Sequence, residues 1–281
     1  MNVKIISAIL ALALASMACG FSVDLPRQRQ VSPEVTDSIS VPDPKSDETR
    51  LRLSFGAGNL KLSPGANNLV EGTALYNVSE LKPEVITNGA DIQIKQGPFE
   101  RIPPFEGMKN EWDLQLGKAP MDLAIEAGAY EGTYDLGGLS LKSLIINDGA
   151  SKVNLSFSAP NPIEMSQFTY TTGASDVRLK ELANANFKTF VFNCGAGDFT
   201  LDFSGKLQRD ATVSIDSGLS DLTLIIPQGG NAVITIDSAL ADIDFGDGWS
   251  QSGKVHTQAG DGPTLTIVIN IGAGNVVVRS N

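Results

Sequence analysis

The fold is decided by the stretch FVFNCGAGDFTL, residues 190–201. Apolar residues alternate with others on both sides of Gly195: two phenylalanines precede it, and Phe199 and Leu201 follow it. An alternation of period two is typical of a β-strand with one buried face. The stretch therefore predicts two short, half-buried strands joined at a glycine.

The same unit recurs along the chain. Its spacing of 21 to 24 residues predicts an array of stacked coils. One coil cannot fold alone, because about four inward side chains contribute ~6–12 kcal/mol, whereas ordering about 22 residues costs ~22–44 kcal/mol. The expected fold is all-β, a single-domain β-solenoid of ~22-residue two-strand coils with capping strands at both ends. The marker glycine, alanine in one unit, stands at positions 128, 149, 173, 195, 218 and 239, with further copies at Gly56 and Gly272; the units at Gly128 and Gly89 are partial.

The pattern divides the chain into four segments. Residues 1–18 are expected to be a signal peptide, and the Pro- and Ser-rich residues 19–48 a tether. Residues 49–100 are expected to form N-terminal capping strands. Residues 101–281 are expected to form the solenoid, with the last strand, 264–279, as its C-terminal cap.

The N-terminus indicates export. Lys4 is followed by an apolar run over residues 5–14, which is too short to span a membrane, and by small residues that end at Cys19. The Ala18-Cys19 pair resembles the end of a bacterial lipobox, although Ser16 stands where Leu is usual. We therefore predict lipidation of Cys19. The alternative is ordinary signal cleavage, with Cys19 as a mere small residue.

Composition excludes several classes of protein. The formal net charge of −11 argues against nucleic acid as a partner, because phosphates require a basic surface. One His and two Cys exclude a zinc finger, an iron–sulfur protein and a disulfide-stapled scaffold.

Two positions of the repeat unit are mostly polar, and their residues could either form tight turns or bind cations. Asn and Asp side chains bond nearby backbone in tight turns, and we favour this interpretation over a ladder of carboxylates that holds cations. The local cluster Asp242, Asp244 and Asp247 is a weak candidate for calcium, because its spacing breaks the EF-hand pattern. We predict no metal site. The two sets are Asn147, Thr171, Asn193, Asp216, Asp237 and Asn270, and Lys152, Asp176, Asp198, Asp221, Asp242 and Asn275.

Few residues of the sequence are suited to catalysis. His256, the only histidine, lies in an alternating stretch and is expected at an exposed strand position. Cys194 is expected to be a small buried residue. Hydrolase elbows and nucleotide-binding loops do not occur in the sequence. We therefore predict that the protein is not an enzyme and needs no cofactor, with a polysaccharide-acting enzyme built on paired carboxylates as a minor alternative.

Two stretches carry a family resemblance. FGAGNLKL at 55–62, together with residues 69–72 and 81–85, resembles the bacterial toast-rack N-terminal domain family. The later coils, with GDGW at 246–249 and IGAGNV at 271–276, resemble the C-terminal β-solenoid of LiaF-like envelope proteins and of adhesin-like proteins. The resemblance implies a solenoid and an exported or membrane-attached setting. It supplies no catalytic residue.

These observations lead to one functional hypothesis with alternatives. We expect a non-enzymatic, lipid-anchored protein on the outer face of a bacterial cell membrane, or a secreted one if Cys19 is not lipidated. It would act as a scaffold or adhesin-like surface for an envelope protein or polysaccharide. The alternatives are a sensory or regulatory module that binds a signalling partner and, less favoured, the polysaccharide-acting enzyme.

Overall fold

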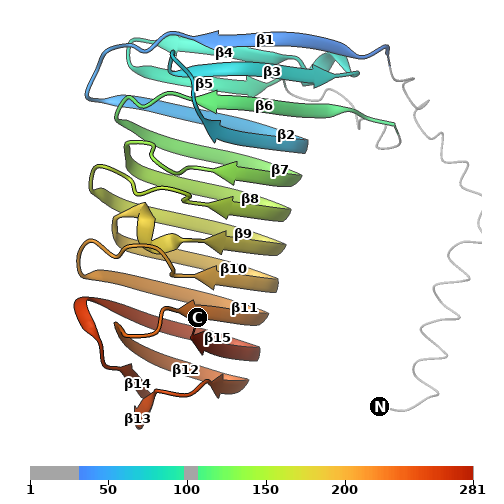
Figure 1. The fold of residues 1–281 in the computed structure, drawn as a ribbon. Helices are drawn as coiled ribbons and strands as arrows, with labels where there is room; N and C mark the ends of the chain where they lie inside the picture. Colours follow the sequence, from blue (N-terminus) through green and yellow to red (C-terminus); the bar gives the residue numbers. More distant parts are fainter. Residues whose placement is uncertain (1–31, 98–106, 281) are drawn as a thin grey trace, which may run out of the picture.

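The computed structural model describes residues 32–97 and 107–280, most of which lie in strands of one sheet (Figure 1). The predicted all-β fold is confirmed: the described helices are two short 3-10 turns, Ser79–Leu81 and Leu182–Ala185. The strands are β1 (Val35–Val41), β2 (Thr49–Pro64), β3 (Val70–Tyr76), β4 (Pro83–Asn88), β5 (Asp91–Gln96), β6 (Asn110–Leu116), β7 (Met121–Asp135), β8 (Leu141–Ser156), β9 (Met165–Lys180), β10 (Phe187–Asp202), β11 (Ala211–Ile226), β12 (Gly230–Phe245), β13 (Ser250–Ser252), β14 (Val255–Gln258) and β15 (Asp261–Ser280).

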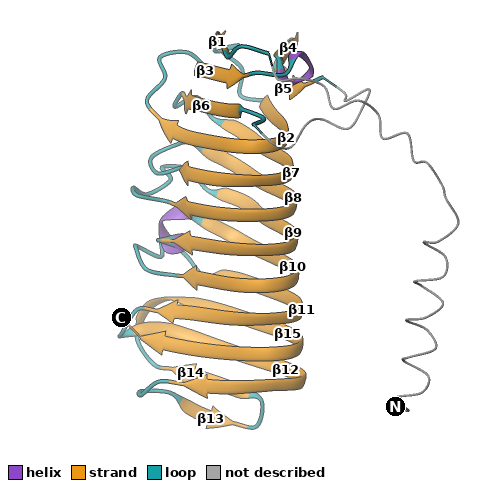
Figure 2. Cartoon of the chain, turned by 90° about the vertical axis from the view of Figure 1, so that its right-hand side faces the viewer, coloured by secondary structure: helices purple, strands orange, loops and turns teal. Residues whose placement is uncertain are grey.

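The body of the molecule is a stack of long parallel strands (Figure 2). They lie in the order β2, β7, β8, β9, β10, β11, β15, β12. Their register places the same repeat position of each coil side by side, so that Phe192 lies between Tyr170 and Ile215. Each coil thus obtains from its neighbours the hydrogen bonds and buried surface that it cannot supply alone.

The two strands expected in each coil are halves of one continuous strand. In the repeat unit of β10 the buried residues are Phe190, Phe192 and Cys194 before Gly195, and Phe199 and Leu201 after it; Phe187, the first residue of the strand, is also buried. The inward positions change from even to odd numbers at the glycine. The strand therefore bends there and buries side chains from both halves in one core.

The marker glycines form a column in which neighbouring backbones approach closely. A Cβ on Gly195 would lie 2.7 Å from the carbonyl oxygen of Gly173, and one on Gly218 would lie 2.6 Å from that of Gly195. Such distances are too short for a side chain, so close approach explains why the marker is glycine. Ala239, the exception among the markers, lies in the terminal strand β12.

Columns of side chains fill the core. Phe168 and Phe190 stack with ring centroids 4.3 Å apart, and Tyr170 lies 5.6 Å from Phe192 in the parallel column. All four side chains are fully buried. Full burial of such a side chain contributes ~1.5–3 kcal/mol, with ~0.5–1.5 kcal/mol more for a well-oriented aromatic pair. The middle coils are therefore the most strongly held part of the stack.

Shorter strands close the N-terminal end of the stack. β5 and β6 each pair with one half of β2, and β4 and β3 continue antiparallel beyond them. β2 itself pairs with β7 along most of its length, so it is the first coil and not a cap. The partial unit at Gly89 is the turn of the β4–β5 hairpin, where Gly89 has a φ of +61°.

The tether expected over residues 19–48 is wrong from Val35 onward. β1 pairs antiparallel with β3 along its whole length. Ile39 and Val41, at alternate positions, are only 4% and 2% exposed. This two-residue alternation is too short to stand out among the prolines that flank it. Residues 19–31 of the expected tether lie outside the described part, and residues 42–48 form the loop between β1 and β2.

The C-terminal strand is not the cap that the sequence predicts. β15 lies between β11 and β12. After β11 the chain passes through the short link 227–229 to form β12 one coil position further along, and β15 later fills the position between them. Its inward isoleucines and valines are buried against coils on both sides. β12, whose Ile243 is 42% exposed, stands at the end, and the β13–β14 hairpin covers its first half.

Candidate functional site

The predicted lipidation site belongs to the N-terminal segment that precedes the described fold. Cys19 and the signal segment 1–18 lie outside the described residues. Within the described residues, no helix has the length and apolar character needed to cross a membrane.

The polar positions of the repeat lie within strands, so their interpretation as turn residues is wrong. They instead form two lines across the coils, into which β15 inserts amides. Asn270 lies between Asp216 and Asp237 and donates to Asp216 Oδ1 at 2.9 Å. Asn275 donates in the same way to Asp221 Oδ1 at 2.5 Å. The amides separate Asp216 from Asp237 and Asp221 from Asp242, whereas Asp176, Asp198 and Asp221 stand side by side in the second line.

The weak calcium candidates lie at the C-terminal end of the stack. Asp242 and Asp244 are exposed on β12, and Asp247 is exposed in the turn that follows it. Over residues 32–97 and 107–280, no group of three or more His, Cys, Asp or Glu residues is arranged to hold a metal ion.

His256 is part of the end cap, and the expectation of an exposed position is wrong. It is 9% exposed and lies flat on Phe245, with ring centroids 3.8 Å apart and planes inclined by 2°. Trp249 packs against the other ring of this pair, Phe245, at 5.2 Å. Burial lowers the pKa of His256. Its neighbours give the imidazole a packing role.

Acidification should therefore weaken the C-terminal end through His256. Because burial lowers the folded pKa below the unfolded value of about 6.5, the unfolded chain takes up the proton more readily. The stabilising contribution is complete above about pH 6.5 and is lost as the pH falls through the folded pKa. His256→Phe keeps a flat ring but cannot titrate. Urea unfolding at about pH 7.5 and 5.5 should show a larger loss of stability in the wild type than in the variant; equal losses would contradict the assignment.

Cys194 is buried as expected, with 7% exposure. Burial raises the pKa of its thiol, which keeps it protonated and unreactive near neutral pH.

A half-buried carboxylate inside the bend escaped the sequence analysis. Asp148 Oδ2 accepts hydrogen bonds from Tyr170 Oη at 2.8 Å, from Tyr130 Oη at 3.1 Å and from Ser151 Oγ at 3.1 Å. Thr172 donates to its other oxygen. Burial raises the pKa of Tyr170 far above its usual range, so its hydroxyl stays a donor. The network joins coils β7, β8 and β9 from within.

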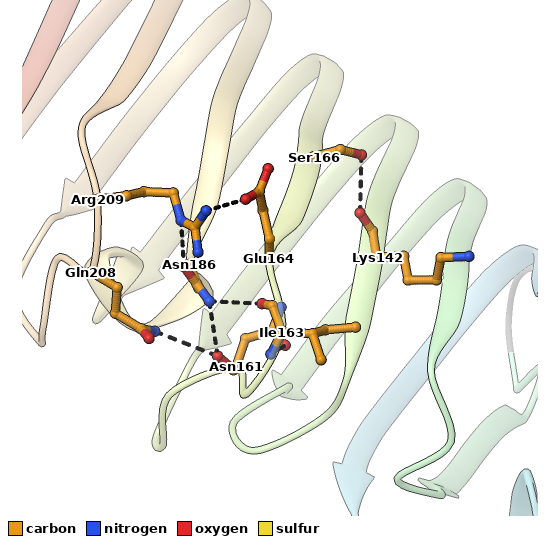
Figure 3. Close-up of polar contacts among 8 residues, drawn as sticks. All are labelled: Lys142, Asn161, Ile163, Glu164, Ser166, Asn186, Gln208 and Arg209. Atoms are coloured by element: carbon orange, nitrogen blue, oxygen red, sulfur yellow. Dashed lines mark hydrogen bonds and ion pairs between the residues drawn. The ribbon is translucent and has the colours of Figure 1, made fainter. Parts of the chain in front are cut away.

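A second polar network on the loop side also escaped it (Figure 3). Asn161, 1% exposed, donates to the carbonyls of Leu141 and Ala185 at 2.9 and 3.2 Å. Arg209 donates to Asn186 Oδ1 at 2.8 Å and pairs with Glu164. These contacts satisfy loop carbonyls in adjacent coils. Asn184, 23 residues after Asn161 and so within the range of the repeat period, donates in a similar way to the carbonyl of Phe157 at 2.9 Å. This recurrence of asparagine was the signal that the sequence offered.

The second half of β12, residues 238–245, is the part of the stack with the strongest features of an interaction surface. We call it the terminal edge. Among the described strands only β15 pairs with it, on one side. Leu240 on this edge is 81% exposed. By contrast, both halves of β2 at the other end are covered.

The fold and these surfaces define a β-solenoid of parallel coils with a closed N-terminal end and a partly open C-terminal end. The chain belongs to the family described as "N-terminal domain of toast_rack, DUF2154", whose profile matches residues 30–165 and 161–225. The toast-rack resemblance read from the sequence is thereby confirmed.

Several solved structures have a similar course of the chain. A "putative cell adhesion protein" from Clostridium sporogenes is 18% identical, with a TM-score of 0.49, over 88% of this chain and 100% of that one. A "putative adhesin" from Bacteroides fragilis is 9% identical, with a TM-score of 0.45, over 87% and 96%. No curated protein matches the chain.

Proposed function

We propose that the protein is a non-enzymatic, lipid-anchored scaffold of the bacterial cell envelope, which binds another envelope component through the surface of its solenoid. The observation that carries the proposal is the rigid stack with its terminal edge left unpaired among the described strands. Natural sheets usually cover or charge such edges, because they template pairing. The terminal edge is not covered, and its exposed Asp242 and Asp244 would repel acidic strands while leaving the backbone groups available to a partner of opposite charge.

The sequence around Cys19 supports the anchoring part of the proposal. Several acyl chains, at ~0.8 kcal/mol per buried methylene, hold a protein stably on a membrane. The acidic chain would be repelled by an anionic membrane surface, so a lipid is the anchor that suits it. The packing of His256 against Phe245 supports a non-enzymatic role, because it removes the best candidate for a general base.

The anchor predicts a simple labelling result. Cells that express the wild type and receive a clickable fatty acid should show a labelled protein in the membrane fraction. Cys19→Ala should be unlabelled and absent from that fraction, because the thiol that accepts the lipid is gone. Cys194→Ala is the matched control and should be labelled like the wild type. Label on Cys19→Ala would remove the anchor from the proposal.

A further inference from the structure

The terminal edge offers backbone groups to a partner. The amide of Gly246 donates to the carbonyl of Val278 on β15 at 2.9 Å. Because successive residues of a strand direct their amides to opposite sides, the amides and carbonyls of 241, 243 and 245 point away from β15. β14 covers Ala232–Thr235 and stops short of them. The edge therefore presents a row of hydrogen-bonding groups with no strand beside it in the described part.

The edge also leaves the core of the last coil partly open. Ile243 occupies the inward position that Val276 and Leu222 fill in the next two coils. Those two residues are 0% and 1% exposed, whereas Ile243 is 42% exposed. A strand added beside residues 241–245 would cover it with its own inward side chains. The site thus requires apolar residues at alternate positions of its occupant.

The outward positions of the edge carry negative charge. Asp242 and Asp244 are exposed and stand on the face opposite to Ile243. An added strand would place its outward side chains next to these carboxylates, where opposite charges stabilise a cross-strand pair and like charges destabilise it. The occupant is therefore expected to carry Lys or Arg at the positions between its apolar residues.

We infer that the terminal edge is a docking site for an extended segment of another protein, in which Lys or Arg alternates with apolar residues and which adds to the sheet as a further strand. This inference rests on the proposed scaffold role and specifies its partner. Main-chain hydrogen bonds would supply affinity, and the alternating side chains would supply specificity.

Charge argues against a second copy of this chain as the occupant. Two terminal edges paired with each other would bring Asp242 and Asp244 of both copies together. The edge strands at the N-terminal end, β1 and β4, carry Asp37 and Glu84 and contain no Lys or Arg. Each of these pairings adds acid to acid, on chains whose formal net charge is −11.

The test uses the full-length protein and three labelled peptides. Lys-Val-Lys-Val-Lys-Val should bind in fluorescence anisotropy. Glu-Val-Glu-Val-Glu-Val should not bind, and Lys-Lys-Lys-Val-Val-Val, with the same composition, should bind at least about tenfold more weakly, because its charges fall on both faces. Equal binding of the two lysine peptides would mean that net charge alone accounts for the binding, and it would overturn the inference. Binding of none of the three would overturn it as well.

Two variants localise the binding. Ile243→Pro removes an amide that points away from β15 and leaves the hydrogen bonds to β15 in place. It should weaken the binding of the alternating lysine peptide by at least about tenfold. Asp242→Lys with Asp244→Lys should reverse the preference in favour of the glutamate peptide. This double change affects exposed side chains, so it keeps the inference testable if the proline variant fails to fold. Unchanged binding by the folded variants would place the site elsewhere.

Two further outcomes separate this inference from competing ones. A dimer of the wild type in sedimentation that is lost in Ile243→Pro would assign the edge to a second copy and overturn the inference. Failure of peptide binding together with normal fatty-acid labelling at Cys19 would overturn the edge site and leave the lipid anchor in place, and the scaffold role would then require another surface of the solenoid.

Discussion

Replacing Gly197 by alanine should destabilise the stack by roughly 4 kcal/mol or more, from backbone strain of about 1–3 kcal/mol and ladder bonds of about 0.5–1.5 kcal/mol each. Gly197 has a φ of +136°, which side chains rarely adopt. A Cβ there would also collide with the carbonyl oxygen of Ser175 in the neighbouring coil. The two coils would have to separate in the middle of the array. Urea unfolding followed by circular dichroism measures the loss.

A variant at Gly229 separates the effect of backbone strain from the effect of the collision with a neighbouring coil. Its φ is +72°, but a Cβ there would meet no atom within 4 Å. Gly229→Ala should therefore cost about 1 kcal/mol, from backbone strain alone. Similar losses of stability for the two variants would mean that the close approach of the neighbouring coil at Gly197 is not what excludes a side chain there.

The repeat made most of the fold predictable. Alternating apolar residues on both sides of a glycine report which positions face inward, and stacking identical coils aligns these positions without further information. Phe190, Phe192, Phe199 and Leu201 are all buried as the period of two requires. The continuous strand through Gly195 was not predictable, because periodicity reports the inward face and not whether the backbone turns or bends.

The order of the coils could not be predicted in the same way. β12 and β15 carry the same unit, so each fits beside β11 in the same register, and period alone does not choose between them. Both strands have apolar residues at the inward positions of both halves, and the difference lies at the outward positions: β12 carries Asp242 and Asp244 beside Ile243, where β15 carries Asn275 and Val277. The strand without these acids suits the internal place beside Asp221 of β11. Alanine in place of the marker glycine at position 239 was the remaining signal that β12 differs from an internal coil.

The surfaces were predicted in composition but not in arrangement. Asp242, Asp244 and Asp247 stood out as acids, yet the terminal edge exists only because β15 takes the place of an internal coil. His256 was assigned to an exposed strand because its stacking partner Phe245 belongs to another strand. Contacts of this kind depend on the tertiary structure, which a local pattern does not contain.

Replacing Phe192 by alanine should cost about 3–5 kcal/mol, the usual loss for a phenylalanine truncated in a core. Its side chain is fully buried in the middle of the stack. The ring lies 5.6 Å from Tyr170 in the adjacent coil β9 and 5.4 Å from Phe199 in its own coil. The cavity would open between these side chains, and the neighbouring backbones could not close it without breaking their hydrogen-bond ladders. The measurement is the free energy of unfolding in urea.

Val191 supplies the matched control, because it is the adjacent residue on the opposite face of β10 and is only half-buried. Val191→Ala should cost about 1 kcal/mol or less, since it removes two methyl groups that are already partly in water. The contrast tests the assignment of faces directly. If the strand were shifted by one residue, every inward side chain would move to the outer face, and Val191 would show the larger loss. The stacked aromatic columns require the opposite result, with the loss concentrated at Phe192.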